Sequence, residues 1–257
     1  MRRTIEEEAE MGAALDSLQA DREALLEICS GFGTADWEAA SGCAGWSVQD
    51  IIAHVGALFW LVVDPSKLPD VAGLPTERAQ DVYVEARRSW SSEQVLADYE
   101  AVSTQAIVAL AGLEAQDFEL PLGDLGTYPA ALLPNAFAFD HYTHIRADLF
   151  GPRGPISGEP PASDELRLVP TLDWIAAAAP QQNADALASL AGALDLVVTG
   201  PGARTIRLGD GAVVGEIRSS APDFVRWVTQ RSTWEQSGVS SDGDEAALAT
   251  GRRLRVF

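Results

Sequence analysis

Two of the three histidines in this 257-residue chain lie three residues apart in the stretch FDHYTHIRADLF, residues 139–150. A helix turns by about 100° per residue, so Asp140 and His144, at positions i and i+4, share one face and can hold one ion together. His141 is three residues before His144 and competes with Asp140 for that place. Imidazole and carboxylate are zinc ligands, and Fe(II), Ni(II) or Mn(II) accept the same donors.

The third histidine, His54, lies in the apolar segment IIAHVGALFWLVV, residues 51–63. This segment is too short to span a bilayer, and we expect a buried helix. A buried imidazole without a partner costs about 1–3 kcal/mol, so His54 needs a hydrogen bond or a metal ion. Two imidazoles and one carboxylate from two helices would leave one coordination position open, as in catalytic zinc sites.

The alternative is that all three histidines make ordinary hydrogen bonds within the fold. In that case no metal is held, and the spacing of His141, His144 and Asp140 has no chemical meaning. Asp148, four residues after His144, is then either a solvated charge or a partner that orients a histidine ring.

Four helices are expected to position these side chains. Ser47 and Asp50 match a variant capping box at the start of one helix, and Pro129 suits the first turn of another, which Pro134 is expected to kink. Four helices of this length favour a four-helix bundle over residues 1–150. The expected helices span residues 4–29, about 47–63, 92–113 and 128–150.

The residue pattern of the sequence changes from helical to strand-like after the stretch GPRGPISGEPPASDE, which we interpret as a linker over residues 151–165. The segments ALDLVVTG, RTIRLGD and AVVGEIRS then alternate apolar and polar residues, as strands do, and RLRVF is a candidate last strand. Helical segments at residues 168–179, 221–230 and 245–250 flank them. The sequence therefore predicts a small α+β domain over residues 166–257 and an α+β protein as a whole.

Composition excludes several classes of partner. The chain carries 38 Asp and Glu against 18 Lys and Arg, a net charge of −20, which argues against nucleic acid. Its 47% hydrophobic and 22% charged residues are typical of globular proteins. The two cysteines form no paired motif, and the N-terminal residues have no apolar signal segment, so we expect a cytoplasmic protein without a membrane anchor.

The phrases GWSVQDIIAHV, residues 45–55, and FDHYTHIRAD, residues 139–148, resemble the mycothiol-dependent maleylpyruvate isomerase family. This resemblance implies a DinB-like metal-binding bundle followed by a sterol-carrier-like domain. In that family the histidine matched by His54 is a zinc ligand, and the last bundle helix carries Glu or His, three residues, and then His. Asp140 and His144 take these two places, and the shorter aspartate keeps His141 open as the alternative.

The resemblance continues through residues 224–257, where the family has an arginine that faces the active site. Arg231 matches that place and is the candidate catalytic residue, a clamp for a substrate carboxylate. The family has Gly-Arg there, whereas this chain has Gln230 and Arg231. The alternative is that Arg231 pairs with a carboxylate of the protein.

The resemblance implies that mycothiol, a small thiol, binds with its sulfur at the open position of the metal and attacks a small electrophile. The product is then either a cis–trans isomer, as in maleylpyruvate isomerase, or a thioether, as in an S-transferase. A non-catalytic protein that binds a thiol and a hydrolase that uses metal-bound water are the alternatives. The oligomeric state and the identity of the electrophile are not encoded in any motif.

Overall fold

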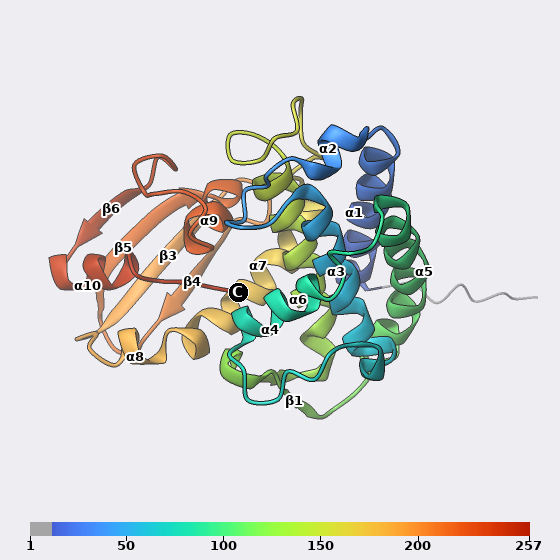
Figure 1. Cartoon of the computed structure of the whole chain (residues 1–257). Helices are drawn as coiled ribbons and strands as arrows, with labels where there is room; N and C mark the ends of the chain where they lie inside the picture. The colour runs from blue at the N-terminus through green and yellow to red at the C-terminus, as the bar shows by residue number, and fades with distance from the viewer. Residues whose placement is uncertain (1–11) are drawn as a thin grey trace, which may run out of the picture.

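The structure, a computed structural model, describes residues 12–257. Helices make up one part of the molecule, and a four-stranded sheet with its own helices makes up the other, as Figure 1 shows. The α+β class is confirmed. Residues 4–11 of the first expected helix lie outside the described residues.

The helical part is a bundle whose helices begin at strong local signals. Ser47 and Asp50 exchange hydrogen bonds between side chain and backbone, 3.1 and 3.0 Å long, and Ser91 forms the same box with Gln94. Large apolar side chains such as Phe59 then fill the space between the helices. The bundle helices are α1 (Ala13–Ser30), α3 (Val48–Val63), α5 (Ser92–Ala111) and α6 (Leu133–Thr143).

The last bundle helix starts later than the sequence predicts. The residue before a proline is biased towards extended backbone, and Tyr128, which precedes Pro129, accordingly lies in a short strand. Pro134 does not kink the helix; it stands in the first turn of α6, where its missing N–H costs nothing. Beyond α6 the chain continues as one π-helical stretch, η4 (His144–Leu149), so the predicted helix over residues 128–150 was wrong in both its start and its regularity.

Short elements connect the bundle helices. Among them is α4 (Thr76–Glu85), which has no counterpart among the predicted helices and which packs against α3. Strands β1 and β2 pair as an antiparallel hairpin ahead of α6. The remaining short elements are α2 (Thr34–Glu38), η1 (Pro65–Lys67), β1 (Glu119–Pro121), η2 (Gly123–Leu125), β2 (Thr127–Pro129) and η3 (Ala130–Leu132).

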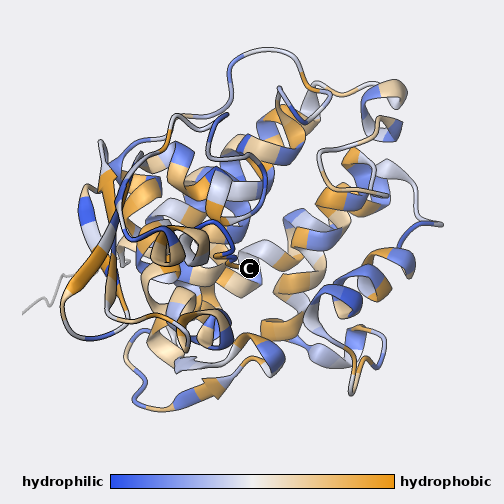
Figure 2. Ribbon diagram, turned by 90° about the vertical axis from the view of Figure 1, so that its left-hand side faces the viewer, coloured by the Kyte–Doolittle hydropathy of each residue, from blue (hydrophilic) through white to orange (hydrophobic). Residues whose placement is uncertain are grey.

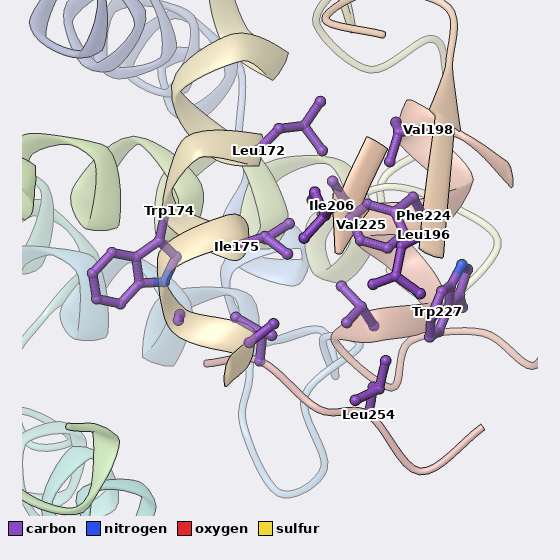
Figure 3. Close-up of a cluster of buried hydrophobic side chains, with 14 of the residues drawn as sticks. Leu172, Trp174, Ile175, Leu196, Val198, Ile206, Phe224, Val225, Trp227 and Leu254 are labelled. Carbon is purple, nitrogen blue, oxygen red and sulfur yellow. The ribbon is translucent and has the colours of Figure 1, made fainter. Parts of the chain in front are cut away.

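Three strands of the sheet, β3, β4 and β5, follow predicted segments, whereas β6 was not predicted. The strand order of the sheet is β4-β3-β5-β6, with β3 antiparallel to β4 and parallel to β5, and β6 antiparallel to β5. Helices α7 and α9 cover one face, and Figure 3 shows Ile175, Leu196 and Phe224 meeting there. The elements are α7 (Glu165–Gln182), α8 (Ala184–Leu187), β3 (Ala193–Thr199), β4 (Arg204–Leu208), β5 (Val213–Ser220), α9 (Ala221–Val228), β6 (Ser240–Gly243) and α10 (Glu245–Gly251).

The expected last strand, residues 253–257, was wrong. Its N–H groups do not pair with a strand: Phe257 donates to the Gln182 side chain, Arg255 donates to the Asn183 side chain, and Val256 donates to the carbonyl of Val228 in α9. Helix α7, which carries Gln182, also packs against α1 and α6. The division into residues 1–150, a linker and residues 166–257 stays a prediction.

The bundle helices turn their apolar sides inward, as Figure 2 shows. Of the helices within residues 12–257, none has the length and apolar character that a membrane crossing requires.

Candidate metal centre

Three of the predicted site residues meet between α3 and the end of α6. Asp140 Oδ1 lies 3.4 Å from His54 Nε2 and 3.5 Å from His144 Nε2. One ligand atom from each residue lies within 4.8 Å of the other two, the spacing of groups that could share one ion. The i, i+4 argument therefore holds for Asp140 and His144, and α3 brings His54 to the same point.

The competing histidine, His141, lies outside this group. Its Nε2 is 3.1 Å from the Tyr99 hydroxyl, and its Nδ1 is 3.1 Å from the carbonyl oxygen of Phe137. The ring is fully buried. Because protein partners already engage both ring nitrogens, Asp140 and not His141 is the third candidate ligand in this arrangement.

A carboxylate on η4 orients the His144 ring. Asp148 Oδ2 lies 2.9 Å from His144 Nδ1, which leaves Nε2 free to face Asp140. Metal-binding histidines ordinarily donate their second nitrogen to a carboxylate in this way. Asp148 is therefore a fully buried partner of His144 and not the solvated charge that the sequence also allowed.

Arg231 holds Asp148 from the opposite domain. Its Nε and Nη2 donate to Asp148 Oδ2 at 2.8 and 2.6 Å, and its Nη1 donates to the carbonyl of Thr229 at 3.2 Å. The arginine thus pairs with a carboxylate of the protein, which was the second of its two predicted roles. A chain of contacts runs from Arg231 through Asp148 to His144.

Gln230 has the left-handed backbone that would suit the glycine of the Gly-Arg pattern implied by the resemblance. Gln230 has φ of 61°, a conformation that favours glycine. Its side chain donates to the carbonyl of Leu254 at 2.8 Å, a hydrogen bond that a glycine could not make. This bond offsets part of the backbone strain next to Arg231.

Burial and neighbouring charges shift the pKa values of the three candidate ligands in opposite directions. Burial raises the pKa of Asp140, but the positive charges of His144 and His54 outweigh it and hold that pKa well below its ordinary value. Burial lowers the pKa of His54. Burial also lowers the pKa of His144, but the carboxylates of Asp140 and Asp148 outweigh burial and raise that pKa well above its ordinary value.

The residues fit a divalent cation. Within residues 12–257, Asp140 Oδ2 has no hydrogen-bond partner, although the atom is buried. Two imidazoles and a carboxylate form the donor set of catalytic zinc sites, and a cation would neutralise the buried carboxylate. Among the described contacts, Asp140 Oδ2 is therefore available to bind an ion.

A tight loop before α3 borders the centre and was missed from the sequence. Gly42 donates its N–H to the carbonyl of Asp148 at 2.8 Å, and a Cβ on Gly42 would lie 2.8 Å from Asp148 Cα. This close approach brings Cys43 Sγ to 3.8 Å from His144 Nδ1 and Trp46 against the rings of His54 and His144. Trp46 belongs to the phrase GWSVQDIIAHV that carries the family resemblance, but no sequence pattern indicates these contacts.

A cavity of about 440 Å³ lies beside this network, on the side of the second domain. Arg153, Arg231 and Arg252 line it, together with Trp227 and Trp234. Arg231 is common to the cavity and to the contacts that support His144. None of the three candidate ligands, His54, Asp140 and His144, lines this cavity.

Comparisons with known proteins show the family and the fold of this chain. The family model described as "Mycothiol maleylpyruvate isomerase N-terminal domain" matches residues 18–149, about half of the chain. The crystal structure of a mycothiol-dependent maleylpyruvate isomerase is similar at 18% identity with a TM-score of 0.58, and the match covers 90% of this chain and 92% of that one. A histidine-to-alanine mutant of that enzyme matches over the same shares at 18% identity with a TM-score of 0.57. No curated protein matches the chain.

Proposed function

Because the chain belongs to the mycothiol maleylpyruvate isomerase N-terminal domain family, we propose that it is a metal-dependent enzyme that uses mycothiol on a small electrophilic substrate. The observation that carries the proposal is the convergence of His54, Asp140 and His144 on one point. Zinc is the ion that best suits two imidazoles and one carboxylate. We assign the reaction to the cytoplasm, because Cys29 and Cys43 are both free thiols.

The protein's own residues have distinct tasks in this proposal. His54, Asp140 and His144 bind the divalent ion, and Asp148 fixes the His144 ring so that its Nε2 faces that ion. A bound divalent ion favours the thiolate over the thiol form of a sulfur ligand at neutral pH. Mycothiol is therefore the proposed nucleophile, and no separate strong base is required from the chain.

The substrate is proposed to enter from the cavity lined by Arg153, Arg231 and Arg252. Arginine binds carboxylates in a bidentate way, so an electrophile with a carboxylate suits this wall. Arg231 is the proposed clamp, in addition to its contact with Asp148.

Metal analysis of the purified protein and of three variants tests the ligand set. We expect His54→Ala and His144→Ala to lose the ion. His141→Gln is the matched control and keeps it, because His141 contacts Tyr99 and Phe137 instead of the centre. Equal metal content in all four proteins, each shown to be folded by circular dichroism, would remove the proposal.

Incubation with mycothiol and maleylpyruvate distinguishes the two reaction types. Isomerase activity gives fumarylpyruvate with the thiol recovered, whereas an S-transferase consumes thiol and gives a stable adduct with its own electrophile. A metal-loaded protein that consumes no thiol with any of a panel of electrophiles would be a binding protein. Hydrolysis of a substrate without added thiol would assign metal-bound water as the nucleophile.

A further inference from the structure

Trp46 is held by hydrogen bonds both at its backbone and at its indole nitrogen. Its backbone belongs to the tight loop before α3, where its carbonyl accepts from the N–H and the hydroxyl of Ser41 at 2.9 Å each. Its indole Nε1 donates to Asp81 Oδ1 on α4 at 3.1 Å. The ring therefore has little freedom to rotate.

The indole lies against both candidate ligand imidazoles. Its ring centroid is 5.0 Å from that of His54 and 6.4 Å from that of His144, and it is nearly parallel to the latter at 25°. The two imidazoles themselves meet edge to face at 4.9 Å. Packing of this kind restricts ring rotation, and ligand geometry in a metal site depends on the neighbours that lock each ring.

The orientation of the His54 ring depends on Trp46 more than the orientation of the His144 ring does. The His144 ring is already oriented by the hydrogen bond from its Nδ1 to Asp148. By contrast, His54 Nδ1 has no hydrogen-bond partner among residues 12–257. With no hydrogen bond on that nitrogen, the packing of the indole has to supply part of the orientation that a carboxylate would otherwise give.

We propose that Trp46, held by Asp81, is a positioning residue of the metal centre that fixes the His54 ring in its ligand orientation. This inference rests on the proposed metal binding by His54, Asp140 and His144. It gives a physical role to the tryptophan of the GWSVQD motif. It also connects α4, which contributes none of the three candidate ligands, to the ion.

Trp60 offers a matched control on the same helix as His54. Its Nε1 donates to Asp98 at 3.1 and 3.2 Å, so Trp60→Phe also removes an indole–carboxylate hydrogen bond. Trp60 makes no ring contact with His54 or His144 among the described residues. A loss of zinc affinity shared by Trp46→Phe and Trp60→Phe is therefore a general effect of removing an indole. A loss of zinc affinity confined to Trp46→Phe is specific to the metal centre.

The experiment measures the zinc dissociation constant of the full chain by chelator competition, together with the quenching of tryptophan emission by Co²⁺. We expect Trp46→Phe to weaken zinc binding about tenfold, as loss of a supporting neighbour does in metal sites, and Trp60→Phe to leave it within about twofold. Co²⁺ should quench part of the wild-type emission, and Trp46→Phe should lose that part.

Asp81 variants separate positioning from simple packing. Asp81→Asn keeps an acceptor for the indole N–H and should keep the wild-type affinity, whereas Asp81→Ala should weaken zinc binding in the same direction as Trp46→Phe. Equal zinc affinity in Trp46→Phe and Trp60→Phe would overturn the inference alone, whether or not Co²⁺ quenching differs between them. Absence of zinc binding in the wild-type protein would overturn the proposed function and this inference with it.

Discussion

Replacement of Arg231 by alanine tests the coupling between the two parts of the protein. Asp148 is fully buried, and Arg231 supplies two of the three hydrogen bonds that its Oδ2 accepts, at 2.8 and 2.6 Å. Removal of one partner from a buried ion pair costs about 3–5 kcal/mol. Arg153 Nε remains 3.8 Å from Asp148 Oδ1, so we expect the lower end of that range, about 3 kcal/mol.

The same substitution should weaken metal binding. Without Arg231, Asp148 is free to turn, and the His144 ring loses part of its orientation. Loss of such a supporting contact ordinarily costs about tenfold or more in metal affinity. Arg231→Lys keeps the charge but not the two-point contact, so it should fall between the wild type and Arg231→Ala.

Urea denaturation followed by circular dichroism, and chelator competition for zinc, measure these two effects. Arg252→Ala is the matched control, because Arg252 lines the same cavity but pairs with Glu245, which is exposed. Exposed pairs contribute about 0–1 kcal/mol, so this variant should unfold nearly as the wild type does. The reasoning is refuted if Arg231→Ala matches Arg252→Ala in both stability and zinc affinity and only raises KM.

Three further predictions concern a buried ion pair, the two cysteines and a residue with a left-handed backbone. Asp21 accepts from Arg146 at 2.8 Å and from Arg167 at 2.7 Å with no exposure of its side chain, so Asp21→Asn should lower the free energy of unfolding by about 3–5 kcal/mol in urea titrations; a change below 1 kcal/mol would contradict this role. Burial raises the pKa of the Cys29 thiol to about 12, so at pH 8 it stays protonated, and iodoacetamide followed by mass spectrometry should modify Cys43 alone until the protein unfolds. Modification of Cys29 in the folded protein would count against that burial. At Gln230, where φ is 61°, a β-branched side chain should be less stable than glycine by about 1–2 kcal/mol in the same titrations, and equal stability of Gln230→Val and Gln230→Gly would disprove the left-handed backbone.

Local signals predicted the parts of the fold that depend on near neighbours. The capping box of Ser47 and Asp50 located the start of α3, and the apolar spacing after Ser91 located α5. The last bundle helix was predicted too long because Pro129 was interpreted as a first-turn proline, whereas the extended backbone that it imposes on Tyr128 places both residues in β2.

The candidate site likewise has features that local spacing predicts and features that depend on distant parts of the chain. Asp140 and His144 could be paired from their spacing alone. His54 lies on another helix, and it was added because a buried imidazole needs a partner and because the family resemblance places a ligand there. Sequence spacing could not decide between Asp140 and His141, because the partner that engages His141 is Tyr99 on another helix. The contact of Arg231 with Asp148 spans 83 residues, and no local pattern encodes it.

An anomalous diffraction map of the zinc-loaded protein, collected on both sides of the zinc edge, tests the central claim most directly. The account predicts one peak about 2.0–2.2 Å from Nε2 of His54, Nε2 of His144 and a carboxylate oxygen of Asp140. A peak at the alternative group of Cys43, His144 and Asp148, or no peak between α3 and the end of α6, would contradict it.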